Sequence, residues 1–540
     1  MKLDPKSFND LPFTHLFKTY ISDFGKLESH FETNPFDENR VQKRVDNFKF
    51  KGERNKSVQI LKELNAQFIN LPQVSESLEK LKNDKAVAVV TGQQLTLYGG
   101  PLFTVFKILT AISTAASIER KYKRPAVPVF WLADEDHDFK EIAAIGVLQP
   151  EDFEKHTLDK ELENYPRVAE MKFGKELNSF RDSLKSSMIE TDFTQELWSL
   201  LDSCYKTGHT IGESFAKLVM TLFAKHGLIL AGSNSKSAKI FTKDVLKLSV
   251  SKAEDLFNSL KKTSDELLNK GFHNQVQVQK SNLFWIDDEN VRRKINLENG
   301  IWSVDGLDIE WNNAELIQNI DTAPEKFSPN VFLRPVLQDM LLPGIAYVAG
   351  PGEVAYYAQM NRFYDTFGLK TPIIIPRFSG TIVESGVDRV LPKLPFSFEE
   401  YSKRIEDLES DFIDHSDAPD IEPVFNEWKK QFEKISTSKV NQIADIDPTL
   451  KGSSEKVKAQ FYTELDKLKG KVYRALKNQD SIQLQRIRKV KSQLFPNENL
   501  QEREIAFIYF MNKYGVNIWD DFPDLLRDEN LLKSHNLIHL

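Results

Sequence analysis

The sequence predicts a mixed α/β protein with a parallel-sheet core, followed by a helical coiled-coil region towards the C-terminus. Apolar runs alternate with helical patterns from about residue 85 onwards. The runs are continuous, which is typical of strands buried on both faces of a parallel sheet. From about residue 386 the chain is charged and poor in glycine, as expected of long helices.

The composition is that of a soluble globular protein with several domains. Of its 540 residues, 40% are hydrophobic and 28% are charged. The formal charge of −7 argues against a general nucleic-acid binder. The sequence contains no run of about 18 apolar residues, so it predicts no membrane-spanning helix. The N-terminus does not resemble a signal peptide, and the single cysteine, Cys204, excludes a disulfide framework. We therefore expect a cytoplasmic protein with no membrane or nucleic-acid partner.

The predicted elements begin with a helical segment over residues 1–84, and the α/β core follows over residues 85–385. Residues 85–92 ("KAVAVVTG") form the first expected strand, and residues 126–133 ("AVPVFWLA") form the second. Between them, one helical stripe is made by Leu102, Val105, Phe106, Leu109, Ile112 and Ala116. Strand, helix and strand in this order make a βαβ unit with a right-handed crossover.

Further strands are expected at residues 227–232, 331–337, 345–350 and 372–377. Residues from about 150 to 325 read as insertions into the core, made of amphipathic helices and a small β-like stretch at 274–288. Residues 496–540 are expected to pack back on the core.

Residues 386–495 are expected to form a helical coiled-coil arm. An apolar stripe recurs there at three- and four-residue steps, and its members are Val457, Phe461, Leu465 and Leu468. A second copy of the chain could cover such a stripe, and two-fold pairing is the commonest closure. We therefore expect a homodimer. The alternative is a monomer in which the stripe packs against the chain's own core.

The first stretch that could carry chemistry lies between the first strand and the next helix. Its residues are Thr91, Gly92, Gln93, Gln94, Gly99 and Gly100. Ligands of open α/β sheets bind outside the carboxyl ends of the strands, and free N–H groups at a helix start favour an anion. The phosphate loop G-x-x-x-x-G-K-[ST] is absent. The alternative is a plain tight turn.

Four carboxylates and a histidine follow the second strand, at residues 134–138. If the strand alternation continued, Asp134, Asp136 and Asp138 would share one face, and Glu135 and His137 the other. Because the side chains then point two ways, no metal site is predicted. One aspartate could bind an ammonium or ribose group while His137 transfers a proton. The alternative is a solvated strand end.

The third stretch is Gly350-Pro351-Gly352-Glu353, between a strand and a helix. It fits the start of the dinucleotide pattern G-x-G-x-x-[GA], but Arg377 replaces the acid expected at the end of the next strand. Glu353 would also place a carboxylate beside any pyrophosphate. An NADP-type oxidoreductase therefore stays a minor alternative.

Five strings occur together along the chain: "VTGQQLTLYGGPLFTVFKILTAI", "PVFWLADEDHDFKEI", "FSPNVFLRPVLQD", "AYVAGPGEVAYYAQ" and "LFPNENLQER" with "NKYG". They extend from about residue 85 to 515. In these strings and their order the chain resembles one family, the bacillithiol biosynthesis cysteine-adding enzymes.

The resemblance implies a Rossmann-like core related to the nucleotidyltransferase and class I synthetase group, with connecting insertions and a helical coiled-coil domain. It also implies a ligase that joins the carboxyl group of cysteine to the glucosamine amine of glucosaminyl-malate. By analogy with the synthetases, ATP would activate cysteine, Mg²⁺ could accompany it, and no tightly bound cofactor is expected. The synthetase signatures "HIGH" and "KMSKS" are absent, so no nucleotide-binding residues are carried over.

These substrates suggest roles for the candidate residues. Asp134 and Asp136 are expected to bind the ammonium, and His137 to accept its proton. The glycine-started helix, Arg334 and Arg377 are expected to bind carboxylate or phosphate. A non-catalytic helical scaffold with an inactive core is the alternative function.

The C-terminal segment could hold a second ligand pocket. Tyr514 could stack on a base and Arg503 could meet a phosphate. The alternative is that both residues serve packing and surface pairing alone.

Overall fold

The computed structural model describes residues 2–68, 71–149, 152–160, 162, 165–415, 421–479 and 481–540. Its internal contacts divide the chain into two compact units. Unit 1 comprises Met1–Gln149, Phe153–Ile382 and Leu500–His539, and unit 2 comprises Pro150–Asp152, Val383–Asn499 and Leu540. The parallel sheet lies in unit 1.

The parallel sheet has five strands in the order β13-β12-β2-β3-β6. The strands are β2 (Val87–Gln93), β3 (Ala126–Leu132), β6 (Ile229–Ala231), β12 (Gly344–Ala349) and β13 (Ile373–Pro376). All neighbouring pairs are parallel. Each strand overlaps a segment predicted to be one, although β2 and β12 each extend one residue beyond it, and the class of fold is confirmed. The order runs outwards from β2 to β3 and β6, and then reverses to β12 and β13.

Helix α5 (Leu102–Tyr122) connects β2 to β3 and packs against both strands. It ends at Lys123, whose φ of 52° is left-handed. The helix is long and apolar enough to cross a membrane, but 78% of its most apolar window is buried inside the protein. It is therefore the core helix of the sheet, and the predicted βαβ unit is confirmed.

The other long helices of unit 1 come from the N-terminal segment and from the predicted insertions. The first group is α1 (His15–Ser22), α2 (Glu38–Asp46), α3 (Arg54–Asn65) and α4 (Pro72–Lys80). The second is α7 (Glu176–Ser187), α8 (Thr194–Cys204), α9 (Ile211–Phe223), α10 (Lys236–Ser251), α11 (Ala253–Asn269) and α12 (Asn313–Thr322).

Two antiparallel sheets accompany these helices. One pairs β4 (Ala144–Leu148) with β5 (Phe153–Thr157). The other has the order β10-β9-β8-β7-β11, with β7 (Leu283–Ile286), β8 (Arg292–Glu298), β9 (Ile301–Val304), β10 (Glu310–Trp311) and β11 (Phe327–Pro329). Of the β-like stretch expected at 274–288, only β7 is a strand.

The predicted strand at residues 331–337 is wrong, because this stretch enters helix α13 (Leu333–Leu341). The side-chain oxygen of Asn330 accepts hydrogen bonds of 3.0 Å from the backbone N–H groups of Phe332 and Leu333. Pro335 lies in the first turn, where its missing N–H leaves no helical bond unmade. A short apolar run does not by itself distinguish a strand from a buried helix.

The N-terminal segment is also not helical throughout. Lys2–Lys6 form β1, which pairs with β15 (His535–His539) from the opposite end of the chain. With β14 (Ser379–Val383) they make a three-stranded sheet in the order β1-β15-β14. No local pattern predicts such a pairing, because the partner strand is remote in sequence.

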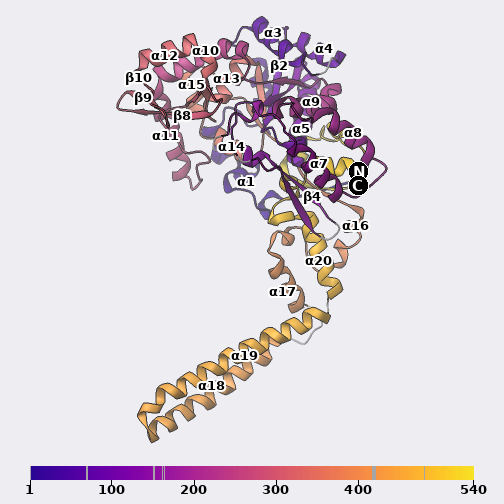
Figure 1. Cartoon of the computed structure of the whole chain (residues 1–540), viewed down its shortest axis with the longest axis vertical. Helices are drawn as coiled ribbons and strands as arrows, with labels where there is room; N and C mark the ends of the chain where they lie inside the picture. The colour runs from indigo at the N-terminus through magenta and orange to yellow at the C-terminus, as the bar shows by residue number, and fades with distance from the viewer. Residues whose placement is uncertain are drawn as a thin grey trace. The chain divides into compact units, whose positions relative to one another are not determined.

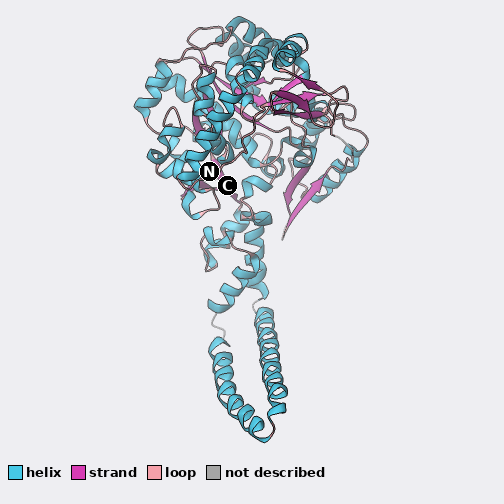
Figure 2. Ribbon diagram, turned by 90° about the vertical axis from the view of Figure 1, so that its left-hand side faces the viewer, coloured by secondary structure: helices cyan, strands magenta, loops and turns pink. Residues whose placement is uncertain are grey.

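Unit 2 contains the helices predicted for the arm, which are α16 (Ser385–Asp388), α17 (Ile405–His415), α18 (Ile421–Ile446), α19 (Lys451–Gln479) and α20 (Ser481–Leu494). α18 and α19 lie side by side as a hairpin in Figure 1 and again in Figure 2. Residues 416–420 and 480, which fall inside the predicted arm, lie outside the described residues.

The predicted apolar stripe of α19 is divided between the hairpin and solvent. Phe461 stacks on Phe432 of α18 with 3.6 Å between ring centroids, and Leu465 is buried. Val457 and Leu468 are 68% and 40% exposed. The hairpin therefore closes on part of the stripe and leaves the rest uncovered.

The homodimer stays a prediction and now rests on these uncovered side chains. Val457→Glu combined with Leu468→Glu should halve the mass measured by light scattering, because a charge at an apolar seam costs several kcal/mol. Since Phe461 and Leu465 remain in place, circular dichroism should show unchanged helix content. Gln460→Glu, exposed on the same helix, is the control and should leave the mass unchanged. A wild-type protein of monomer mass would contradict the prediction.

His535 is buried in the three-stranded sheet between two hydroxyl groups. Its Nδ1 lies 2.8 Å from Ser379 Oγ, and its Nε2 lies 2.9 Å from Thr381 Oγ1. Burial lowers the pKa of His535 to about 4, although the nearby carboxylate of Glu502 acts in the opposite direction. The folded protein therefore keeps this imidazole neutral at neutral pH.

We predict that His535 lowers the free energy of unfolding as the pH falls from 7 to 5. The unfolded chain takes up a proton near the ordinary pKa of about 6.5, whereas the folded protein excludes it until the pH reaches about 4. At pH 5 this difference costs roughly 2 kcal/mol. Urea titrations at both pH values measure the cost, and His535→Gln, which cannot titrate, should lose that part. The same pH dependence in both proteins would show that the side chain does not contribute.

Candidate functional site

A cavity of about 480 Å³ opens at the carboxyl ends of the parallel strands. Residues 92–94 reach it from the end of β2, and residues 350–353 reach it from the end of β12. The strand order reverses between these two neighbouring strands. Open α/β sheets bind ligands there, because the connections leave the two strands towards opposite faces and open a crevice. We refer to this cavity as the switch-point pocket.

Cationic side chains outnumber carboxylates in the lining of the pocket. The cations are Lys107, Arg334, Arg377 and Arg503, and the carboxylates are Glu141 and Glu353. Tyr347 and Tyr356 add hydroxyl groups. Such a lining suits an anionic ligand that also carries a cationic or hydroxyl-bearing part.

Lys107 and Glu353 form an ion pair in the pocket wall, with 2.5 Å between Nζ and Oε2. Lys107 also donates to the backbone oxygen of Gly92 at 2.7 Å and to Gln93 Oε1 at 3.1 Å. Burial lowers the pKa of Lys107, while the charge of Glu353 opposes the shift. The ammonium therefore joins the end of β2 to the residues that follow β12.

Glu353 occupies the start of helix α14 (Pro351–Tyr357). It accepts hydrogen bonds of 2.7 Å from the backbone N–H of Gly350 and from the hydroxyl of Tyr347. A pyrophosphate bound as in dinucleotide enzymes would need this position for its own negative charge. The arrangement disfavours the oxidoreductase alternative.

Arg334 and Arg377 enter the pocket from α13 and from the end of β13. Arg334 donates to Gln338 Oε1 and to the hydroxyl of Tyr356, both at 3.2 Å. These partners are uncharged, so neither neutralises the guanidinium. Arg377 donates instead to both carboxylate oxygens of Glu502, at 2.6 and 3.0 Å.

The glycine turn before α5 does not line the pocket. Phe507 donates its backbone N–H to the oxygen of Gly100 at 3.2 Å, and Leu102 donates to Ile505 at 2.9 Å. Gly99 and Gly100 have φ of 82° and 77°, which glycine adopts without strain, and a Cβ at Gly99 would meet the Phe507 ring. The C-terminal segment thus covers the turn, which favours the plain-turn alternative for Gly99 and Gly100 but not for residues 92–94, which line the pocket.

Two further candidates lie away from the pocket lining. Thr91 is buried and donates its hydroxyl to the oxygen of Val348 at 3.1 Å, which links β2 to β12. Tyr514 lies at the end of α22 (Phe507–Tyr514) and packs against the hydrophobic core. Arg503, which was paired with Tyr514 in the predicted second pocket, lines the switch-point pocket instead.

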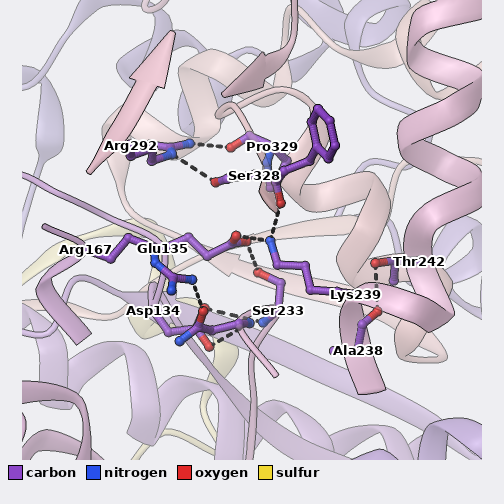
Figure 3. Close-up of polar contacts among 12 residues, drawn as sticks. Asp134, Glu135, Arg167, Ser233, Ala238, Lys239, Thr242, Arg292, Ser328 and Pro329 are labelled. Carbon is purple, nitrogen blue, oxygen red and sulfur yellow. Dashed lines mark hydrogen bonds and ion pairs between the residues drawn. The ribbon is translucent and has the colours of Figure 1, made fainter. Parts of the chain in front are cut away.

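Asp134 and Glu135, the first two carboxylates after β3, are buried inside the protein (Figure 3), whereas His137 and Asp138 are exposed. β3 ends at Leu132, so the strand alternation expected through residues 134–138 does not continue. Asp134 accepts hydrogen bonds from the backbone N–H groups of Ser233 and Asn234, at 3.4 and 3.2 Å, just beyond the end of β6. Glu135 pairs with the buried ammonium of Lys239.

Burial sets the charge states of this cluster. It raises the pKa of Asp134 to about 7, and the charge of Glu135 adds to the effect. Burial alone would also raise the pKa of Glu135, but Lys239 and the hydroxyl of Ser233 hold it below its ordinary value. The pKa values of these two adjacent carboxylates are therefore shifted in opposite directions, and Glu135 is the ionised one.

Neither Asp136 nor His137 lines the pocket, but Asp136 is hydrogen-bonded to a residue that does. Gln94 donates its amide to Asp136 at 2.9 Å and to Glu141 at 2.6 Å, and both Gln94 and Glu141 line the pocket. His137 is half-exposed. Burial and the charge of Arg292 lower its pKa, although Asp136 acts in the opposite direction. The imidazole is therefore neutral at pH 7, in the form that can accept a proton.

Sequence patterns missed several residues that line the pocket: Phe103, Lys107, Trp131, Glu141, Gln275, Tyr347 and Tyr356. Lys107 was the most detectable, because a lysine in an otherwise apolar stretch of a core helix must find a buried partner. Among the described residues, no group of three or more His, Cys, Asp or Glu side chains is placed to hold a metal ion.

Comparisons with known proteins show the family to which the chain belongs. Residues 1–378 match the family described as bacillithiol biosynthesis BshC, N-terminal Rossmann-like domain. Residues 380–540 match bacillithiol biosynthesis BshC, C-terminal coiled-coil domain. The chain belongs to the BshC family. The Rossmann-like core and the helical coiled-coil domain predicted from the sequence are both confirmed.

Relatives of BshC type are similar over most of their length. The protein of Salinibacter ruber is 32% identical over 463 residues, covering 85% of this chain and 84% of the relative. That of Koribacter versatilis is 30% identical over 516 residues, 95% of each chain, and that of Geobacillus sp. 28% over 536 residues, 98% of each. All three bear the name "Putative cysteine ligase BshC".

We predict that the buried pair of Glu135 and Lys239 is needed for stability. Glu135→Gln should lower the free energy of unfolding by roughly 3–5 kcal/mol, because it leaves the Lys239 charge buried without a counter-charge. Combining it with Lys239→Met should recover most of the loss, since the charge is then removed as well. Urea titrations of the three proteins measure this. A double variant no more stable than Glu135→Gln would show that the ion pair is not the cause.

Proposed function

We propose that the chain is a cysteine ligase of bacillithiol biosynthesis, which joins the carboxyl group of cysteine to the glucosamine amine of glucosaminyl-malate. The observation that carries the proposal is the switch-point pocket, with its excess of cations, in a member of the BshC family. Forming the amide bond links the carbonyl carbon of cysteine to the amine nitrogen, and the carboxylate oxygen must leave.

The pocket offers complementary groups for both substrates. Malate carries two carboxylates, which Arg334 and the other cations of the lining can bind. Cysteine and glucosamine carry ammonium groups, for which Glu141 is the carboxylate not already paired with Lys107. These assignments follow from charge and from the position of the side chains in the lining.

The amine must lose a proton before it attacks, and His137 is our candidate for accepting it. Its lowered pKa keeps the imidazole neutral at pH 7. Gln94 and Asp136 connect its backbone to the pocket, since the N–H of His137 donates to Asp136 Oδ1 at 2.7 Å. Asp134, hydrogen-bonded to backbone groups, would support this turn and not contact substrate.

A carboxylate does not acylate an amine without activation, so the reaction needs an energy source. By analogy with the synthetases we propose ATP, with Mg²⁺ as its ordinary companion ion. The described residues include no phosphate loop, and we assign no side chain to the nucleotide. The cytoplasm, where cysteine is reduced, is the expected location.

Cells that lack this chain test the proposal directly. They should lose bacillithiol and accumulate glucosaminyl-malate, measured by mass spectrometry of thiol-labelled extracts. Restoring the wild-type chain should restore bacillithiol. Unchanged bacillithiol without accumulation of the precursor would refute the ligase.

Variants then separate an enzyme from a scaffold. His137→Ala and Arg334→Gln should each lower bacillithiol at least tenfold in the complemented cells, with melting temperatures close to wild type. His209→Ala replaces another partly buried histidine outside the pocket and should restore the full level. A scaffold would tolerate all three changes equally.

A further inference from the structure

Helix α21 (Gln501–Glu504) is a single turn that reaches the pocket from a remote part of the sequence. The side chain of Gln501 fixes it to β14, accepting from the backbone N–H of Ile382 at 2.8 Å and donating to its oxygen at 2.9 Å. The next two residues, Glu502 and Arg503, have different surroundings and therefore different roles.

Glu502 is fully buried and holds Arg377 in place. Besides the two bonds from the guanidinium, it accepts hydrogen bonds from the hydroxyl of Ser379 at 3.0 Å and the N–H of Gly380 at 2.9 Å. Burial alone would raise the pKa of Glu502, but Arg377 holds it below its ordinary value. The pair is therefore ionised, and its charges cancel.

The charge that remains for a ligand lies elsewhere in the lining. Lys107 is balanced by Glu353, and Arg377 is balanced by Glu502. Arg334 has only uncharged partners within hydrogen-bond distance. Arg503 is exposed at the pocket, and its guanidinium makes no hydrogen bond or ion pair with another described residue.

We propose that α21 completes an anion subsite of the pocket, in which Arg503 contacts the anion and Glu502 is the positioning residue for Arg377. The ligand group is a carboxylate or a phosphate, since a guanidinium binds both in a two-pronged manner. The proposal deepens the proposed function and rests on it only for the choice of malate as a probe.

Calorimetric titration of the full chain with malate, and separately with inorganic phosphate, tests Arg503. The anion that binds wild type identifies the group. Arg503→Gln should weaken that binding at least tenfold, the range of a lost charged hydrogen bond. Arg527→Gln, an arginine of the same C-terminal segment outside the pocket lining, should bind like wild type. Equal affinity of Arg503→Gln and wild type, or no binding of either anion by wild type, would overturn the proposal.

Glu502→Gln tests the positioning role. In protein shown to be folded at the temperature of the titration, Arg377 is no longer held by a carboxylate, and the affinity for the anion should fall severalfold. His535→Gln is the matched control, because it disturbs the same buried network without touching Arg377 and should leave affinity unchanged. A purely structural role would instead lower the melting temperatures of both variants and leave both affinities at the wild-type value.

The two proposals fail in different ways. Unchanged bacillithiol in deleted cells, together with Arg503-dependent anion binding, would remove the ligase and keep the subsite. If deletion abolishes bacillithiol but the Arg503 and Glu502 variants bind the anion as wild type does, the ligase proposal would stand and the subsite proposal would be wrong.

Discussion

The reversal of strand order between β2 and β12 is the constraint on which the rest of the structure depends. Parallel strands place all their carboxyl ends at one edge, and the reversal opens a crevice between two of them. The chain fills that crevice with the residues that follow β2, β12 and β13, so segments far apart in sequence meet in one pocket. The ends of β3 and β6 meet beside it and form the buried cluster of Asp134 and Glu135.

Buried ion pairs hold these strand ends together. Lys107 with Glu353 joins β2 to the residues after β12, Glu135 with Lys239 joins β3 to α10, and Arg377 with Glu502 joins β13 to α21. Removing a charge from water is costly, so each charged side chain is stable in the interior only while its oppositely charged partner stays in place. The pairs therefore fix the edge of the sheet in one arrangement. The consequence is that a single substitution in any of them strongly destabilises the protein.

The C-terminal segment is part of the core and not an appendage of the arm. It returns to unit 1 after the helices of unit 2, covers the start of α5 and pairs β15 with β1. The glycines of the turn before α5 serve this contact, since a side chain at Gly99 would collide with Phe507. Two glycines of a stretch that looked like a ligand loop are thus explained by packing against a remote segment, whereas residues 92–94 of the same stretch line the pocket.

The sequence by itself determined the class of fold, the strands of the parallel sheet and the helical arm, because these follow from apolar runs and helical periodicity that each segment carries locally. It also pointed to the ends of β2 and β12 as candidate ligand sites, because that rule needs only the carboxyl ends of predicted parallel strands, and residues at both ends line the pocket. Only the tertiary structure decided which charges remain available. Whether Arg377, Glu135 or Asp134 faces a ligand depends on partners such as Glu502, Lys239 and Asn234, which lie about a hundred residues away. The helix at Arg334, the strand β1 and the place of Arg503 in the pocket were decided in the same way, by contacts that no local pattern contains.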